Sequence, residues 1–168
     1  MAVSPSDVII RLSGGSINTD PDASLGGVMS NTSPDPIALN NLFDNVSAGE
    51  SAAGSIDYRC VYILNNHGTD TLNSVAIWFN GDSPATGSAM GLALDPAGID
   101  EDATTIANET TAPAGVTFLT PYAEIDAIAI GNLGPGQYIG VWLRRTIEAG
   151  ADAYANDGVT LRIKGTPA

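Results

Sequence analysis

Glycine and proline recur along the whole chain, and their spacing excludes long helices. The 168 residues include 19 Gly and 10 Pro, so turn-forming residues interrupt almost every stretch of the sequence. Both residues weaken helix interiors and favour turns, which leaves room only for short regular elements. Apolar residues still make up 43% of the chain, which is enough for a packed core. The pattern predicts an all-β chain of short strands rather than strands alternating with long helices.

Alternating apolar residues between the turns place the expected strands. They are residues 7–12, 58–64, 74–80, 88–94, 116–119, 124–130, 138–147 and 159–164. The residues expected in the core are Val61, Ile63, Val75, Ile77, Leu92, Val141, Leu143 and Leu161. Turn-forming residues between the second and third of these strands predict that the two form a hairpin. Strands joined by turn clusters are typical of an antiparallel β-sandwich.

The chain length fits a single domain over residues 1–168. Within it, residues 13–56 form an irregular arm or loop region, rich in turn formers and poor in alternation. Residues 57–168 carry the main sandwich core, which the first strand at 7–12 joins. Apolar residues at helical spacing within residues 36–46, behind Asp35 as a cap, predict one short helix in the arm.

The irregular arm is the segment expected to carry function, because a compact domain rarely holds a long loop without a use for it. Its candidate partner-contact residues are apolar side chains in otherwise polar surroundings: Leu25, Val28, Ile37, Leu42 and Phe43. A segment of this kind becomes ordered by lying along a surface. That surface is either the second face of its own sheet or a neighbouring subunit, and the sequence leaves both open.

The charge balance limits the partners that the chain can have. Nineteen acidic residues against six basic ones give a net charge of −13. Such a chain repels phosphate and anionic lipid, so we expect no nucleic-acid partner and no membrane partner. No run reaches the roughly 18 apolar residues of a membrane helix, and residues 1–12 lack the features of a signal peptide. We therefore expect a soluble chain made in a cytoplasm.

Few residues offer the chemistry of an active site or a metal site. His67, the only histidine, lies in a polar turn, and no Gly-x-Ser-x-Gly motif accompanies it. Cys60 is the only cysteine, which excludes an internal disulfide. Two acidic groups lack EF-hand spacing and fit solvated loops better than calcium sites: Asp20 with Asp22, and Asp95 with Asp100, Glu101 and Asp102. We expect no catalytic residue, no cofactor and no metal.

The tryptophans and the one basic pair also have structural explanations. Trp78 and Trp142 could stack on sugars, but both lie within strands beside core positions, which favours packing. Arg144 and Arg145 should point to opposite faces of their strand, since side chains alternate along it. Acids that follow closely in the sequence, such as Glu148 or Asp152, are their expected partners.

Two stretches resemble the Ig-like modules of bacterial and phage surface proteins. They are YRCVYILNNHGTDTLNSVAIWF and, later in the chain, IGNLGPGQYIGVWLRRTIEAGA. The run Leu133-Gly134-Pro135-Gly136 fits the L-x-P-G corner that opens a long strand in those modules, because Pro fixes φ and Gly permits positive φ. The resemblance implies an antiparallel Ig-like or jelly-roll-type β-sandwich with a long irregular N-terminal arm.

A longer pattern resembles a group of uncharacterised virion proteins of tailed bacteriophages. It begins with LSGGSINTDPDASLGG and NNLFDNVSAGESAAGSIDYRCVYILNN, continues through LDPAG, IANETTAPAGVTF and GNLGPGQ, and ends with WLRRTIEAGADAY. The pattern covers nearly the whole chain, and no catalytic motif belongs to it.

This second resemblance implies a non-enzymatic virion structural protein, made in the cytoplasm of a host bacterium. A head decoration or cement protein is the favoured interpretation. Such a protein stabilises the particle through contacts with the major capsid protein, with other virion subunits and with copies of itself as a homo-oligomer. Two alternatives remain: a phage neck, tail or fibre accessory protein, and a carbohydrate-binding or adhesion module.

Overall fold

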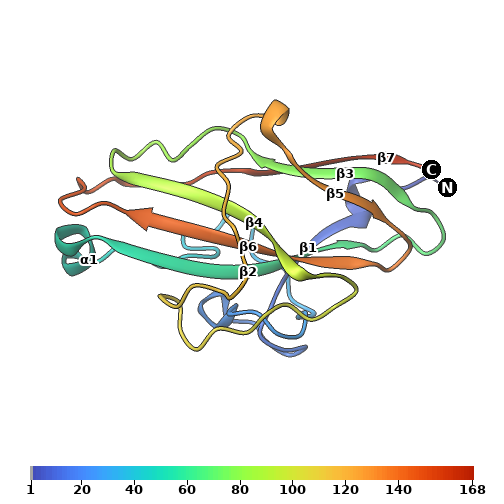
Figure 1. Ribbon diagram of the computed structural model, residues 1–168, viewed down its shortest axis with the longest axis horizontal. Coiled ribbons are helices and arrows are strands. Elements are labelled where there is room, and N and C mark those ends of the chain that lie inside the picture. Colours follow the sequence, from blue (N-terminus) through green and yellow to red (C-terminus); the bar gives the residue numbers. More distant parts are fainter. Residues whose placement is uncertain (1) are drawn as a thin grey trace.

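Two antiparallel sheets pack face to face in the computed structural model, which describes residues 2–168 (Figure 1). The four-stranded sheet has the order β1-β2-β6-β4, with β1 at Val8–Leu12, β2 at Ser55–Asn65, β6 at Tyr138–Ile147 and β4 at Ser88–Ile99. The three-stranded sheet has the order β5-β3-β7, with β5 at Ile128–Leu133, β3 at Leu72–Phe79 and β7 at Leu161–Pro167. This arrangement confirms the prediction of an all-β sandwich.

Within the described residues, helical structure is limited to four short pieces. They are α1 at Ala48–Ala53 and the 3₁₀ turns η1 at Pro5–Asp7, η2 at Pro21–Ala23 and η3 at Glu124–Asp126. No helix in residues 2–168 is long and apolar enough to cross a membrane. Short pieces of this kind agree with the density of Gly and Pro along the chain.

The core lies between the two sheets and consists mostly of the residues expected there. Seven of the predicted side chains are buried: Val61, Ile63, Val75, Ile77, Leu92, Val141 and Leu143. Leu161 points the same way but is only partly buried. It lies on β7, an edge strand with a neighbour on one side only, so less of its surface is covered.

The predicted hairpin between the second and third strands is wrong. β2 pairs with β1 and β6, whereas β3 pairs with β5 and β7, so the link between them crosses from one sheet to the other. Asn65 fixes this crossing, because its side-chain amide donates to the carbonyl oxygens of Asp70, Leu133 and Gly134 at 3.0, 2.9 and 3.1 Å. A polar turn that would suit a hairpin therefore serves as a corner between sheets.

Several strand boundaries differ from the prediction. Residues 116–119 make one isolated bridge, between Leu119 and Leu92, instead of a strand. The predicted strand at 124–130 begins with η3, and β5 starts only at Ile128. β4 extends beyond the predicted end through an irregular stretch, and Gly98 there has a φ of +93° that favours glycine.

The helix predicted at residues 36–46 is absent, and α1 begins immediately after it. Asn40 has a φ of +60°, which a right-handed helix does not allow. Asp35 caps only a turn, since its carboxylate accepts from the Ile37 amide at 2.9 Å. α1 instead starts at a capping box, in which Ser47 and Glu50 bond to each other's backbone amides.

The first half of the irregular region, residues 13–33, lies along the outer face of the four-stranded sheet (Figure 1). The Leu12 amide donates to Thr32 at 2.8 Å and the Cys60 amide donates to Ser24 at 2.8 Å, so the loop is bonded to β1 near its end and to β2 at its middle. The sequence left two surfaces open for this stretch: a face of its own sheet, or a neighbouring subunit. In the structure, residues 13–33 lie on their own sheet.

Candidate functional site

The five residues predicted to contact a partner lie in three different environments. Leu25 packs on the outer face of the four-stranded sheet, against the apolar cluster around Trp142. Leu42 and Phe43 are partly buried against the main core. Val28, 49% exposed, and Ile37, 91% exposed, reach solvent. The structure therefore does not bring the five together into one patch.

A layer of loops covers the outer face of the four-stranded sheet (Figure 1). We call residues 13–33 and 100–119 the loop layer. The two segments are bonded to each other, since the Gly27 amide donates to Ala103 at 2.9 Å and the Ile106 amide donates to Leu25 at 3.0 Å. The side chains buried between the layer and the sheet are Tyr58, Cys60, Tyr62, Ala93 and Trp142 from the sheet, and Ala103 and Ile106 from the layer.

Two aromatic side chains anchor the loop layer to the sheet. The Tyr62 hydroxyl donates to the Gly27 carbonyl and accepts from the Ala103 amide at 2.7 Å. The Trp142 indole N–H donates to Asp95 of β4 at 2.8 Å, and the same carboxylate oxygen accepts from the Thr104 amide of the loop layer at 2.9 Å. The Trp142 ring is fully buried. The predicted packing role of Trp142 is therefore confirmed, and this ring offers no stacking surface.

Trp78 lies on the other side of the molecule, on the outer face of the three-stranded sheet. It is partly buried, and the Lys164 ammonium lies 5.8 Å from a ring centroid. Lys164 also pairs with Glu124 at 2.6 Å. The two tryptophans therefore do not share a surface that could bind a sugar.

Three of the six acidic residues that the sequence singled out accept hydrogen bonds from backbone amides: Asp20, Asp95 and Asp100. Asp95, only 3% exposed, accepts from the amides of Ala97 and Thr104, both at 2.9 Å. Asp100 accepts from Gln137 at 2.8 Å, and Asp20 accepts from the Asp22 amide at 3.0 Å. Within residues 2–168, no group of three His, Cys, Asp or Glu side chains has an arrangement that could hold a metal ion.

Arg145 is one of two buried arginines at the α1 end of the sandwich. Its guanidinium pairs with Asp57 at 2.8 Å and with Asp44 at 3.1 Å. Asp57 lies directly opposite on β2, so the register of the sheet forms this pair. The predicted partners Glu148 and Asp152 are wrong, because both follow the end of β6 whereas Arg145 points into the sandwich.

Arg59, the second buried arginine, reaches the edge of β2 beyond the end of β1. It pairs with Asp22 at 3.0 Å and with Glu109, and its Nε donates to the Leu42 carbonyl at 3.1 Å. The Phe43 ring lies against both cations, with its centroid 5.5 Å from the Arg59 guanidinium and 5.0 Å from that of Arg145. Phe43 therefore anchors the arm to the body of the same molecule.

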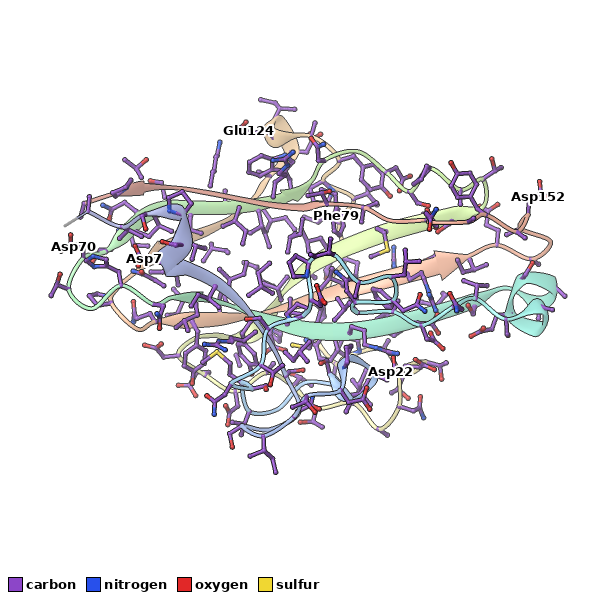
Figure 2. The ribbon with its side chains drawn as sticks, turned by 180° about the vertical axis from the view of Figure 1, so that it is seen from behind. Asp7, Asp22, Asp70, Phe79, Glu124 and Asp152 are labelled. Carbon is purple, nitrogen blue, oxygen red and sulfur yellow. The ribbon has the colours of Figure 1, made fainter. Side chains whose placement is uncertain are left out.

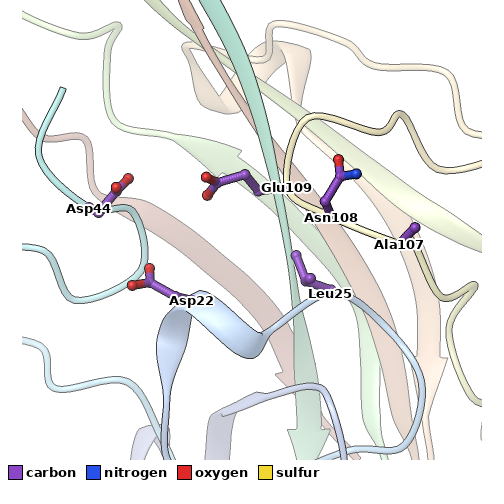
Figure 3. Close-up of a pocket in the computed structure, with 6 residues that line it drawn as sticks. All are labelled: Asp22, Leu25, Asp44, Ala107, Asn108 and Glu109. Atoms are coloured by element: carbon purple, nitrogen blue, oxygen red, sulfur yellow. The ribbon is translucent and has the colours of Figure 1, made fainter. Parts of the chain in front are cut away.

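A shallow acidic pocket of about 300 Å³ opens beside these ion pairs (Figure 3). The carboxylates of Asp22, Asp44 and Glu109 face one another across it, and Leu25 lines its side. Arg59 and Arg145 already bind these acids from within. The acids of the pocket therefore belong to internal ion pairs that hold the loop layer and the arm to the sheet.

A larger cavity, which we call the end cavity, lies between the two sheets near α1. Its volume is about 690 Å³. Its apolar wall includes Phe79, Met90, Leu143, Ile147 and Leu161, and residues 39–48 close one side of it. Apolar pockets of this size are typical of ligand or partner sites.

His67 and Cys60 both have structural roles. The Nδ1 atom of His67 accepts from the amides of Thr69 and Asp70, at 3.3 and 2.9 Å, and so braces its own turn. Cys60 is completely buried, and this burial raises the pKa of its thiol, which keeps the sulfur protonated.

No family model, no curated protein and no solved structure matches this chain.

Proposed function

We propose that the chain is a non-enzymatic structural protein of a tailed-bacteriophage particle, most specifically a head decoration or cement protein. Its partners are the major capsid protein or other virion subunits, together with further copies of itself. The sequence resemblance supports this assignment, and so does a rigid body of two packed sheets. An Ig-like or jelly-roll-type topology, and residues 13–56 as an N-terminal arm, form part of the same proposal.

The observation that carries the proposal is the exposed surface of the loop layer. Ile17 is 91% exposed there and Val28 is also exposed, although both belong to a segment that is firmly bonded to the sheet. Exposed acids, among them Glu101 and Asp102, belong to the same layer. Apolar anchors on a rigid surface with a charged rim are typical of interfaces between proteins.

The charge of this surface indicates the kind of partner that fits it. Arg59 and Arg145 are buried in internal ion pairs, so they contribute little positive charge outside. The remaining surface is strongly acidic in a chain of net charge −13. A capsid face with basic residues around an apolar depression would complement it.

Buried and braced reactive groups support a structural role over an enzymatic one. Cys60 is inaccessible, and His67 uses its Nδ1 lone pair within its own turn. A neck, tail or fibre protein would use the same surface and remains the alternative within this class. The buried ring of Trp142 gives the carbohydrate-binding alternative less support.

The test compares two isoleucines that are equally exposed on opposite sides of the molecule. Ile17 belongs to the loop layer, whereas Ile125 lies on η3, next to the Glu124 labelled at the top of Figure 2; both are 91% exposed. Purified particles that lack the protein are mixed with each variant and sedimented. We expect Ile17→Ser to weaken binding at least about tenfold, as loss of an interface anchor does, and Ile125→Ser to bind normally.

Mass spectrometry of purified particles gives the direct check. The chain should be present at many copies per particle. Its absence from particles, or equal binding by the Ile17→Ser and Ile125→Ser variants, would contradict the proposal.

A further inference from the structure

β7 is an edge strand whose outward peptide groups are open. The Asn80 amide donates to the Thr160 carbonyl at 2.9 Å and the Ala168 amide donates to Thr71 at 3.0 Å. The backbone N–H and C=O groups of the even-numbered residues of β7 therefore point toward β3. Those of Leu161 and Ile163 point away from the sheet. No backbone bond to these outward groups occurs within residues 2–168. An edge of this kind can accept another strand.

The side chains along this edge are also incompletely covered. Val159, Leu161 and Ile163 pack against the core but remain only partly buried. β7 ends at the C-terminus, on the side of the molecule away from α1, so residues 159–163 are the part of this edge nearest α1 (Figure 1). One more strand beside residues 159–163 would complete the burial of these three side chains.

The end cavity continues directly from this open edge. Val159 and Leu161 line it, and Phe79, Met90 and Leu143 form its inner wall. A strand that pairs with β7 directs every second side chain toward the core side of the sheet. Apolar side chains at those positions would enter the cavity of about 690 Å³.

Charge at the cavity selects among possible strands. Asp44, Asp152 and Asp157 all line it. Arg145 is the basic residue on its wall, and internal pairs with Asp57 and Asp44 already hold that guanidinium. A segment with Lys or Arg between its apolar residues fits this environment, whereas an acidic segment is repelled.

We propose that the β7 edge and the end cavity together accept an extended, basic and apolar segment from a neighbouring protein subunit. Backbone bonds to Leu161 and Ile163 would hold the segment, and its alternate apolar side chains would fill the cavity. The source of the segment, another subunit of the particle, rests on the function proposed above. The binding chemistry follows from this chain alone and can be tested without particles.

The test uses the full chain and a defined probe, the capped peptide Lys-Val-Lys-Val-Lys-Val-Lys. Amide NMR signals are followed during titration. We expect saturable shifts at Leu161 and Ile163, and slower hydrogen exchange of both amides. The charge control, Glu-Val-Glu-Val-Glu-Val-Glu, should not bind.

Two variants at one position separate backbone pairing from side-chain packing. Ile163→Pro removes an outward N–H without touching a bond to β3, whereas Ile163→Ala keeps that N–H and shortens the side chain. We expect Ile163→Pro to weaken binding of the Lys-Val peptide at least about tenfold and Ile163→Ala to weaken it less. Melting curves of both variants verify that they are folded.

Three results would overturn the acceptor site. They are the lack of saturable binding of the Lys-Val peptide, shifts centred on β1 or β5, and dimerisation of the chain through β7 in place of peptide binding. Presence in particles without peptide binding would refute the acceptor site alone. Peptide binding by a chain that is absent from particles would refute the proposed function alone.

Discussion

Asp57 and Arg145 form an ion pair in which both side chains are buried and face each other across β2 and β6. One carboxylate oxygen of Asp57 accepts from the Nε and an Nη of Arg145, while the other oxygen has no hydrogen-bond partner among residues 2–168. Such a pair is sensitive to change, because removal of one charge leaves the other in a site of low polarity.

Asp57→Asn should therefore destabilise the protein by about 3 kcal/mol. This value is at the lower end of what is found when one partner of a buried pair is removed. Arg145 would keep Asp44, which is more exposed and compensates only in part. Chemical denaturation of the wild type and the variant measures the difference in the free energy of unfolding.

The matched control is Glu124→Gln, which breaks the exposed pair with Lys164. Exposed pairs contribute less than about 1 kcal/mol, so this variant should unfold nearly as the wild type does. Equal destabilisation by Asp57→Asn and Glu124→Gln would show that the buried Asp57–Arg145 pair contributes no more to stability than an exposed pair does.

At the scale of single elements, the sequence predicts strands well where burial controls the alternation. β6 has the predicted bounds, because Val141 and Leu143 face the core and the strand is central. Residues 116–119 alternate in the same way but pair only at Leu119. Alternation reports which side chains are buried, and it does not report which strand lies alongside.

The candidate site was less predictable for the same reason. Phe43 is apolar among polar neighbours, which indicated a partner contact, yet its ring lies between Arg59 and Arg145 of the same chain. Those arginines are distant from Phe43 in the sequence, so no local pattern links the three. The open edge of β7 depends on the sheet order, which spacing alone does not determine.

The two halves of the irregular region should differ in their resistance to proteolysis. Residues 13–33 make backbone bonds to β1, to β2 and to residues 100–119 of the loop layer. Residues 36–41 are exposed throughout and make no backbone–backbone bonds to the rest of the described chain. Proteinase K should therefore cut first within 36–41, since a protease needs a locally unfolded stretch of chain.

Mass spectrometry of the first fragments identifies the cleavage position. Early cleavage within residues 13–33 would contradict the docking of that loop on the sheet.

At the scale of the whole molecule, buried tyrosine hydroxyls and a buried thiol make stability depend on pH. Burial raises the pKa of the Tyr62 hydroxyl and of the Cys60 thiol, both beneath the loop layer. Burial, and then the nearby Asp82 carboxylate, raise the pKa of Tyr122 from 10.0 to about 12. These three groups keep their protons in the folded state at pH values where the unfolded chain has lost them.

The sign of the effect follows from this difference in bound protons. Above about pH 9, where the unfolded thiol and then the phenols begin to ionise, the folded state binds more protons. The free energy of unfolding therefore falls as the pH rises, and the stability contributed by Tyr122 is lost as the pH passes the pKa of Tyr122 in the folded state.

Urea denaturation at pH about 8 and about 11 should show a lower midpoint at the higher pH. Tyr122→Phe should reduce the decline, whereas Tyr154→Phe, which changes an exposed ring, should not. A midpoint that stays constant or rises would mean that Tyr62, Cys60 and Tyr122 are not buried in solution as they are in the structure.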